Sequence, residues 1–304
     1  MKNSIALIIF NRPDTTQRVF NVIREAKPKK LFVIADGPRL NVPGDKDKCI
    51  KTRNIINQVD WDCEVIKRYS DTNLGCGLSP SNGISWVFDQ VDKAVFLEDD
   101  CLPDLSFFQF CDELLEKYEN DERIMMISGT NILGEWKSQS QSYHFAYYSY
   151  IWGWASWKRA WNFYDYNISE WSKPEVKALI KKMINDEEQF TRLERSFNSV
   201  VSEGNEKSVW DYQWAFARFK QAGLSIIPSK NLISNIGFSK DATHTKSLVM
   251  GVSNLEAKTI QFPMIEPPAI TVDREFDNRH SQIFRRKTIW KRLANRIWIL
   301  LRSK

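Results

Sequence analysis

The sequence predicts an α/β fold, with a mostly parallel β-sheet flanked by helices. The first observation is that short apolar runs alternate with helical patterns through residues 1–130, which is typical of βαβ units. The second is that polar residues directly follow several apolar runs, as they do where strands end at a sheet edge. The third is an ordinary globular composition, because 42% of the 304 residues are hydrophobic and 27% are charged.

The elements of the first half follow from these runs in order. We expect a strand over 4–10 and a helix over 14–26, with Asp14 placed to cap that helix. The turn-forming sequence Asp36-Gly37-Pro38 ends the second strand, and a Gly-rich loop occupies 71–80. The remaining expected strands are 31–35, 64–68, 94–97 and 125–128, and the remaining expected helices are 47–59, 81–89 and 105–118.

The alternation is lost in the second half, where most of the 12 Trp residues lie. An aromatic-rich stretch covers 134–172, and little periodicity remains after 254. Helices are expected over 174–185, 187–203 and 209–221, and a strand over 225–228. The chain therefore divides into two halves of one domain, a wrapping segment and a tail. Their boundaries are 1–130, 131–250, 251–284 and 285–304.

The tail carries the positive charge of the chain. Residues 285–304 contain eight Lys or Arg and no acid, whereas the other 284 residues contain 35 basic and 38 acidic side chains. Nucleic acid is therefore not an expected partner of the body. Trp290, Leu293, Ile297 and Leu301 recur on one helical face. The tail is thus expected to be an amphipathic helix that binds an anionic membrane surface, and docking on the body or on a partner chain is the alternative.

Cysteine usage and the N-terminus favour a cytoplasmic protein. The five Cys are odd in number and form no C-x-x-C pair, which argues against a disulfide framework or a zinc site. The apolar run at the N-terminus is short and meets Asn11-Arg12-Pro13-Asp14 at once, so it suits a strand better than a signal peptide. No window approaches the length of a membrane span.

Three consecutive acids, Glu98, Asp99 and Asp100, follow the apolar run Ala94–Leu97 in the sequence VFLEDDC. Adjacent carboxylates repel, so they need solvation or a compensating cation. A solvated acidic turn is the alternative for such a motif taken alone. Asn11-Arg12 and Asp36-Gly37 also follow predicted strands. Together with the three acids, these polar groups favour a site for Mg²⁺ or Mn²⁺ at the sheet edge.

At this point the chain resembles the GT-A nucleotide-sugar glycosyltransferases, in particular bacterial members similar to glycosyltransferase family 2. The sequence pattern is also similar to that of N-acetylglucosaminyltransferase I-like enzymes, whose metal-binding motif is likewise Glu-Asp-Asp. The resemblance covers roughly residues 4–245. The motifs that carry it are IIFNRPD, VIADGPR, NLGCGLSPSNG, VFLEDDC, WGWASW, WDYQW and FSKDATHT.

The resemblance implies a role for each matching residue. The first half would bind the nucleotide sugar, with Asp36 on the nucleobase and Asp100 as the direct metal ligand. Glu98 and Asp99 would orient the ribose, the donor sugar and metal-bound water. The other expected donor-binding residues are Phe10, Asn11, Arg12, Asn73, Gly75 and Asn82. For Asp36, a simple turn-forming role is the alternative.

Asp211 is the expected catalytic base. It lies among aromatic residues in Trp210-Asp211-Tyr212-Gln213-Trp214 at the start of a helical pattern. A partly desolvated carboxylate has a raised pKa that suits proton abstraction from an acceptor hydroxyl. The alternative is that Asp211 stabilises the first turn of its helix. In the resembling family an acid at this point is the base of inverting transfer.

His244 and several Trp residues complete the expected site. His244 is a reasonable third ligand for Mn²⁺, although a lone His is more often a surface or packing residue. Trp152, Trp154 and Trp210 are expected on the acceptor side, where aromatic rings stack on sugars. Packing within an aromatic core is the alternative for such rings. Gly153 would allow a close approach or a sharp turn.

The leading hypothesis is a metal-dependent inverting glycosyltransferase. It would move a sugar from a nucleoside diphosphate donor, with uridine diphosphate (UDP) the expected nucleotide, to a hydroxyl of a surface polysaccharide or lipid-linked glycan. A sugar-1-phosphate nucleotidyltransferase is an alternative, but the loop after the first strand, FNRPDTTQR, has no Gly to cradle phosphates. The other alternative is a non-catalytic glycan-binding or membrane-associated protein that uses its Trp-rich face. We expect a cytoplasmic enzyme on the inner face of the cell membrane.

Overall fold

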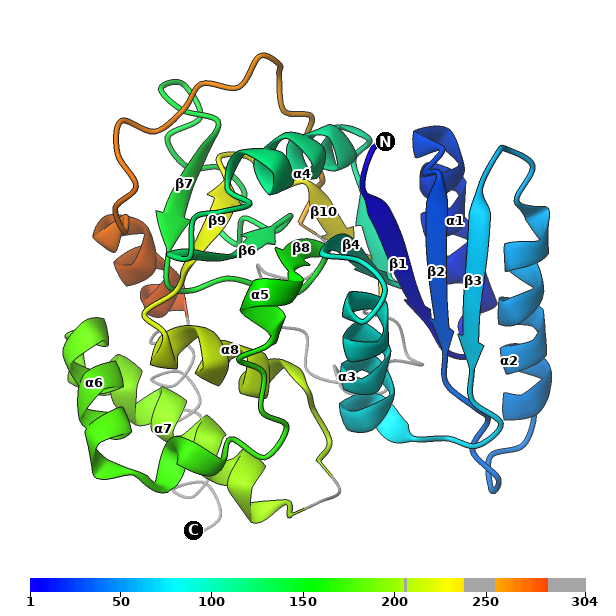
Figure 1. Cartoon of the computed structure of the whole chain (residues 1–304), viewed down its shortest axis with the longest axis horizontal. Coiled ribbons are helices and arrows are strands. Elements are labelled where there is room, and N and C mark those ends of the chain that lie inside the picture. The colour runs from blue at the N-terminus through cyan, green and yellow to red at the C-terminus, as the bar shows by residue number, and fades with distance from the viewer. Residues whose placement is uncertain (205–206, 238–254, 284–304) are drawn as a thin grey trace, which may run out of the picture.

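A computed structural model describes residues 1–204, 207–237 and 255–283 of the chain. Its centre is an eight-stranded sheet with the strand order β3-β2-β1-β4-β8-β6-β9-β7 (Figure 1). The strands are β1 (Ser4–Ile9), β2 (Lys30–Ala35), β3 (Glu64–Tyr69), β4 (Lys93–Glu98), β6 (Ile124–Ser128), β7 (Tyr143–Ala146), β8 (Trp154–Trp157) and β9 (Leu224–Pro228). A separate two-stranded sheet pairs β5 (Cys101–Pro103) with β10 (Ile233–Asn235).

The predicted α/β fold with a large helix-flanked sheet is confirmed. The strands β3, β2, β1 and β4 are all parallel, as the alternating pattern of the first half predicts. In the rest of the sheet, β6 and β9 are parallel, whereas β8 runs antiparallel to both β4 and β6, and β7 runs antiparallel to β9. The sheet is therefore mixed, and it is continuous through both halves of the chain.

Helices cover both faces of this sheet (Figure 1). They are α1 (Pro13–Ala26), α2 (Asp45–Asn54), α3 (Gly75–Phe88), α4 (Ser106–Lys117), α5 (Lys158–Trp161), α6 (Pro174–Ile184), α7 (Glu187–Ser202) and α8 (Asp211–Lys220). Successive strand residues point to opposite faces. In β1, Ile5 and Leu7 pack with α1 and α4, whereas Ala6 and Ile8 pack with α3, α5 and α8.

The starts of α1 and α3 differ from the expected ones for identifiable reasons. Helix α1 begins at Pro13, which suits a first helical position, and its N-cap residue Arg12 makes no side-chain cap. Helix α3 begins at Gly75, six residues before the expected start at residue 81. The Asp36 carboxylate accepts hydrogen bonds from the backbone N–H groups of Leu74 and Gly75. The start of α3 is therefore stabilised by a residue that follows β2, far away in the sequence, and the local sequence could not reveal this.

The aromatic stretch contains two strands that the sequence did not predict. The motif WGWASW, expected to be an acceptor-side element, forms β8, and its neighbours in the sheet are β4 and β6. Trp154 faces the Phe96 ring at 4.6 Å, and the Trp157 indole N–H donates to the carbonyl of Leu115 on the other face. Gly153 precedes β8 with φ of +62°, a conformation that favours glycine.

The last described segment is attached to the body at several points. Ile260 and Ile265 bond to Ser106 of α4 and to Ser142, which precedes β7. A helical stretch follows over 274–283, where Asp277 accepts hydrogen bonds from the backbone N–H groups of Tyr147 and Tyr148. The predicted wrapping segment overlaps this region and stays a prediction. The basic tail, 285–304, lies outside the described residues.

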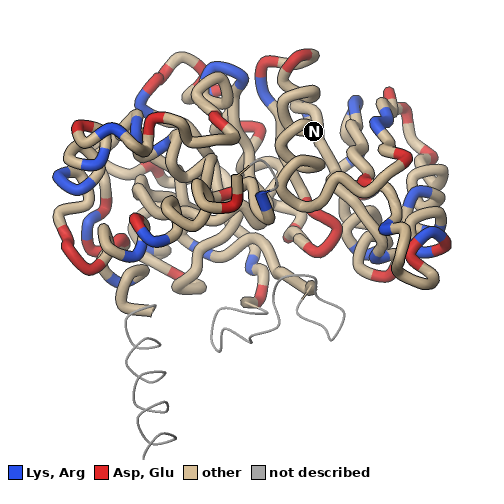
Figure 2. The backbone as a smooth tube through the Cα atoms, turned by 90° about the horizontal axis from the view of Figure 1, so that it is seen from below, with Lys and Arg blue, Asp and Glu red and all other residues tan. Residues whose placement is uncertain are grey.

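Charge is dispersed over the described backbone. In Figure 2, Lys and Arg positions and Asp and Glu positions both lie scattered along the described tube, with tan stretches between them. Within the described residues, no helix combines the length and the apolar character that crossing a bilayer requires.

Candidate active site

The residues that follow β1 and the acids at the end of β4 meet at the switch point of the sheet. Strand β1 pairs with β2 on one side and with β4 on the other, so the chain leaves β1 between two diverging connections. A crevice outside the carboxyl ends of the strands is expected at such a point. Residues 10–12 follow β1 there, and Glu98 is the last residue of β4, with Asp99 and Asp100 directly after it.

Arg12 lies against the acidic triplet. Its Nη1 is 2.6 Å from Asp100 Oδ2 and 3.4 Å from Asp99 Oδ1. The backbone N–H of Phe10 donates to Asp99 Oδ2 at 3.2 Å. Burial disfavours the charged guanidinium, but Asp99 and Asp100 outweigh that cost and raise the pKa of Arg12. The structure thus brings together the predicted residues that follow β1 and β4.

One guanidinium does not neutralise this cluster. Burial raises the pKa of Glu98 well above its ordinary value, and the negative charges of Asp100, Asp99 and Asp211 raise it further. Burial together with Asp100 raises the pKa of Asp99 to about 7, against the opposing effects of Arg12 and the Phe10 N–H. Four carboxyl groups, those of the triplet and Asp211, thus act on one another beside a single guanidinium. The site therefore attracts a further cation.

Asp211 belongs to the same site. It is the first residue of α8 and is partly buried. Its charge contributes to the raised pKa of Glu98 and of Cys76, which places its carboxylate near the end of β4 and the start of α3. The fold thus brings Asp211 close to Glu98, although more than one hundred residues separate them in the sequence. An acid at the N-terminus of a helix is stabilised by the helix dipole, so the alternative role at the helix start fits this position. The role of Asp211 as catalytic base stays a prediction.

Asp36, Asn73 and Gly75 come together in a second network. Asp36 Oδ1 accepts from the N–H groups of Gly37 and Leu74, both at 2.8 Å, and Oδ2 accepts from Asn73 Nδ2 and the Gly75 N–H, both at 3.0 Å. Burial raises the pKa of Asp36 against the effect of these donors. With 6% of its surface exposed, Asp36 holds the start of α3 in place. Its predicted role on a nucleobase stays a prediction.

Asn11 points into a third network, which the sequence did not reveal. Its side-chain amide donates to Asp45, a residue with 1% of its surface exposed. Arg39 donates to the same carboxylate at 3.0 and 2.9 Å, and its guanidinium lies 5.3 Å from the centre of the Phe10 ring. The hydrogen bond from Arg39 is the main cause that lowers the pKa of Asp45 to about 2. In the sequence Asp45 is one of several acids in a polar loop, with no signal to single it out.

Asn82 lies apart from these networks. It is exposed on α3, and its backbone carbonyl accepts a hydrogen bond from Arg68 of β3 at 3.3 Å. The contacts of the described residues do not join its side chain to the acidic triplet. Its place in the donor site stays a prediction.

Two of the three predicted acceptor-binding Trp residues belong to the core. Trp154 and Trp210 expose 1% and 4% of their surface, and their rings pack together at 5.8 Å. Neither ring can stack on a sugar in this structure, and the alternative of aromatic packing is correct for both. Both rings pack among the buried side chains between the sheet and α8. Trp152 is only partly buried and lies beside Tyr150 at 5.3 Å.

Tyr212 and Cys76 lie next to predicted site residues in the sequence or the structure, and the sequence analysis did not single them out. Tyr212 directly follows Asp211 and exposes 40% of its surface, so it is the outward-facing ring of the WDYQW motif. Helical spacing could have found it, because residues 210 and 214 share one face of α8 and residue 212 points away from that face. Cys76 lies near Glu98, Asp211 and Asp36, although burial is the main cause that raises its pKa.

The donor set fits a divalent cation in part. Asp99 and Asp100 present carboxylates in a region of excess negative charge, which is the ligand chemistry that Mg²⁺ and Mn²⁺ prefer. Within the described residues, no three His, Cys, Asp or Glu side chains are grouped as a metal site. Sites for Mg²⁺ often use one or two carboxylates and take their other ligands from water and phosphates. The predicted ligand His244 lies outside the described residues.

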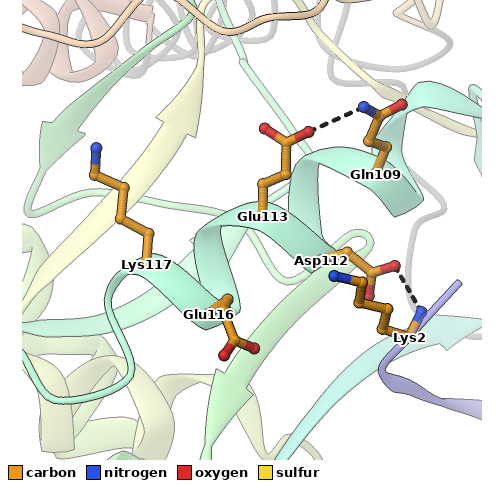
Figure 3. A pocket seen from close by; sticks show the side chains of 6 residues that line it. All are labelled: Lys2, Gln109, Asp112, Glu113, Glu116 and Lys117. Carbon is orange, nitrogen blue, oxygen red and sulfur yellow. Dashed lines mark hydrogen bonds between the residues drawn. The ribbon is translucent and has the colours of Figure 1, made fainter.

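A surface hollow elsewhere has no connection with this site. Figure 3 shows its lining side chains, which come from α4 and from Lys2 just before β1. The backbone N–H of Lys2 donates to Asp112 at 2.8 Å. The amino end of β1 is opposite the edge that carries Arg12 and Asp100. The hollow is therefore not a candidate for the chemistry of the acidic triplet.

Gly237 sets the position of the Asp100 carboxylate. A Cβ atom at Gly237 would lie 2.0 Å from Asp100 Oδ2. We expect Gly237→Ala to displace Asp100 and to lower the free energy of unfolding by about 1 kcal/mol, as overpacking does. Denaturant unfolding measures the stability, and loss of Mn²⁺ binding measures the displacement. A variant with wild-type stability and Mn²⁺ affinity would contradict the tight contact.

Comparison with known proteins adds three remote structural likenesses. The sequence matches no model of a known protein family and no curated protein. The structure of TarS from S. aureus is 11% identical, with 77% of this chain matching 60% of that one at a TM-score of 0.41. UDP-glucose pyrophosphorylase in complex with UDP-glucose is 10% identical over 78% of this chain and 94% of its own, with a TM-score of 0.38.

The third likeness is to mouse xyloside xylosyltransferase 1, which is 7% identical. It covers 71% of this chain and 81% of the mouse protein, with a TM-score of 0.33. The match to TarS spans only 60% of that structure. None of these likenesses assigns a reaction to the chain, so the assignment of a function depends on the site itself.

Proposed function

We propose that this protein is a metal-dependent, inverting glycosyltransferase that uses a nucleoside diphosphate sugar. The observation that carries the proposal is the meeting of Arg12, the acidic triplet and Asp211 at the switch point of the sheet. These residues come from three distant parts of the chain. A solvated acidic turn would not bury Asp99 or place a partly buried acid from another helix beside Glu98.

The residues supply the groups that sugar transfer requires. Asp211 accepts the proton of an acceptor hydroxyl, and the hydroxyl oxygen then forms a bond to the anomeric carbon of the donor. The bond between that carbon and the phosphate oxygen breaks, and the electron pair leaves with the nucleoside diphosphate. Attack opposite the leaving group inverts the configuration at the anomeric carbon. Arg12 lies beside the triplet, where its positive charge favours the departing diphosphate.

A divalent cation would be held by Asp100, with Asp99 beside it and His244 as the proposed further ligand. When bound, such a cation stabilises the negative charge of the leaving diphosphate as a Lewis acid. Mn²⁺ and Mg²⁺ are the proposed ions. The proposed nucleotide is UDP, and the proposed acceptor is a surface polysaccharide or a lipid-linked glycan. Attachment of the tail to the inner face of an anionic membrane completes the proposal.

The test is calorimetric titration of the full chain with a panel of nucleotide sugars, with and without Mn²⁺. We expect one uridine diphosphate sugar to bind, and to bind more tightly when Mn²⁺ is present. If no nucleotide sugar binds, the proposal that the protein is a glycosyltransferase is wrong, and a glycan-binding protein is favoured. Pyrophosphate-dependent formation of a nucleoside triphosphate from the bound nucleotide sugar would instead identify a nucleotidyltransferase.

Asp100→Asn tests the metal part of the proposal. An amide lacks the negative charge that a divalent cation needs, so we expect the increase in affinity due to Mn²⁺ to fall by about tenfold, within the range for changes around metal sites. Asp104→Asn is a matched control, because Asp104 caps the nearby α4 through Ser106 and lies four residues further on. An unchanged response to Mn²⁺ in Asp100→Asn would show that Asp100 is not the ligand.

A further inference from the structure

We propose that Arg12 is the resident counterion of the acidic triplet, and that a divalent cation must displace it from Asp100. This inference rests on the proposed function and concerns how its metal site works. Its consequence is that the free protein binds the metal weakly. The diphosphate, by attracting the released guanidinium, favours metal binding beyond the ligands that it contributes itself.

The geometry indicates that Arg12 and the divalent cation would compete for the carboxylate of Asp100. The 2.6 Å contact between Arg12 Nη1 and Asp100 Oδ2 is the shorter of the two ion pairs that Arg12 makes with the triplet. The same oxygen faces Gly237. An ion that coordinates Asp100 Oδ2 therefore needs the space and the charge that the guanidinium now occupies.

Asp100 is the partner that cannot move. Its carbonyl accepts a hydrogen bond from the backbone N–H of Ile236 at 2.8 Å, and the next residue, Cys101, pairs with Asn235 in the small sheet. The absence of a side chain at Gly237 gives Asp100 Oδ2 just enough room.

Arg12 is the partner that can move. It precedes the first residue of α1, and 24% of its side-chain surface is exposed. A long side chain with several rotatable bonds can swing toward solvent or toward a ligand at modest cost. A planar guanidinium also suits phosphate oxygens as well as carboxylates. Release from Asp100 would thus leave Arg12 beside the site, with a new anionic partner in the diphosphate.

The charges explain why both cations are attracted but compete. The triplet and Asp211 together hold four carboxyl groups, whereas Arg12 brings one guanidinium to them. A second cation is therefore attracted to the site. Two cations on one carboxylate oxygen repel each other, so a divalent ion, which has twice the charge of the guanidinium, must displace Arg12.

The experiment compares Mn²⁺ affinity in three full-length proteins by the electron paramagnetic resonance signal of free Mn²⁺, first alone and then with saturating UDP. The proteins are the wild type, Arg12→Gln and Arg24→Gln. Arg24 is the matched control, because it lies on the same helix, about 18 Å along the axis at 1.5 Å per residue, and pairs with Asp60.

We expect Arg12→Gln to bind Mn²⁺ on the order of tenfold more tightly than the wild type in the absence of UDP, because a positive charge a few ångströms away has been removed. UDP should strengthen Mn²⁺ binding less in Arg12→Gln than in the wild type, and Arg24→Gln should behave as the wild type. If Mn²⁺ binds the wild type and Arg12→Gln equally, or the variant more weakly, the inference is wrong and the proposed function stands. If Mn²⁺ binds to neither protein, with or without UDP, both fail.

A second measurement uses the wild type alone. The Nε–Hε resonance of Arg12, assigned by its absence in Arg12→Lys, should shift when Mg²⁺ and UDP are added to protein labelled with ¹⁵N-arginine. The resonance of Arg24 should stay in place. A resonance of Arg12 that does not respond to saturating Mg²⁺ and UDP would overturn the inference even if Arg12→Gln does not fold.

Discussion

Replacement of Asp211 by Asn is expected to lower the kcat of sugar transfer by about 10²- to 10⁴-fold, the usual contribution of a general base. An amide has nearly the shape of the carboxylate but cannot accept the proton of the acceptor hydroxyl. Asp211 is the first residue of α8 and acts on the pKa of Glu98 from there. The affinity for UDP should stay within a few-fold of the wild type, because Asp211 is proposed to contact the acceptor rather than the nucleotide.

The measurement is the release of UDP in the presence of acceptor, with the donor that calorimetry identifies. Glu175→Gln is the control, since Glu175 also lies in the first turn of a helix, α6, and is exposed. Both substitutions remove a favourable interaction with a helix dipole, worth up to about 1 kcal/mol. Only Asp211→Asn should affect catalysis. Equal rates for Asp211→Asn and the wild type would move the base to another residue.

The second large effect is a pH-dependent loss of stability due to His144. This residue lies on β7 with 2% of its surface exposed, and its ring is 4.3 Å from that of Phe276. Neither ring nitrogen has a hydrogen-bond partner among the described residues. Burial lowers the pKa of His144 to about 3, with a smaller opposing effect of Asp273. The unfolded chain has an ordinary His pKa of about 6.5.

The sign of the effect follows from these two pKa values. Below about pH 6.5 the unfolded state binds a proton that the folded state does not, so the wild type loses stability as the pH falls. The variant His144→Phe lacks this proton. The free energy of unfolding of the variant minus that of the wild type should therefore rise by about 2.5 kcal/mol between pH 7 and pH 4.5, at 1.36 kcal/mol per pKa unit.

Denaturant unfolding at several pH values measures this difference. Asp277, whose pKa burial raises to about 7, has the opposite pH dependence, but it is present in both proteins and cancels in the difference. The difference should be constant above pH 7.5, which serves as an internal control. A difference that is also constant between pH 7 and pH 4.5 would show that the His144 ring is protonated or hydrated in the folded state.

Local pattern was sufficient for the first half of the fold. The strands β1, β2 and β4 are short, mostly apolar runs followed by polar residues, whereas β3 is mixed, with the sequence EVIKRY. Their parallel pairing follows from the helices between them. The strand β8 was missed because it is buried on both faces. A run such as Trp154-Ala155-Ser156-Trp157 then has neither the alternation of a surface strand nor enough length to be distinguished from a loop.

The sequence was sufficient to predict which acidic residues lie close together. The acidic triplet and Asp211 are conspicuous because acids among apolar residues need a reason, and the structure gathers them. The binding roles of individual residues were less predictable, because hydrogen-bond partners come from distant parts of the chain. The carboxylate of Asp36 is engaged by residues 37 and 73–75, and Asn11 turns to Asp45. Aromatic rings near a site pack or bind according to the helix face that they occupy, as Trp210 and Tyr212 show.

The antiparallel strand β8, between β4 and β6, makes the two halves of the chain one folding unit. A fragment cut after residue 130 would leave β4 as an open edge with its Phe96 ring uncovered, and such edges recruit other chains. The halves cannot swing apart on a linker either, because a continuous ladder of backbone hydrogen bonds runs between them. A large ligand must then reach the carboxyl edge of the sheet past the loops along its rim. A chain that exchanged residues 131–250 for those of another protein would have to receive a new β8 with them.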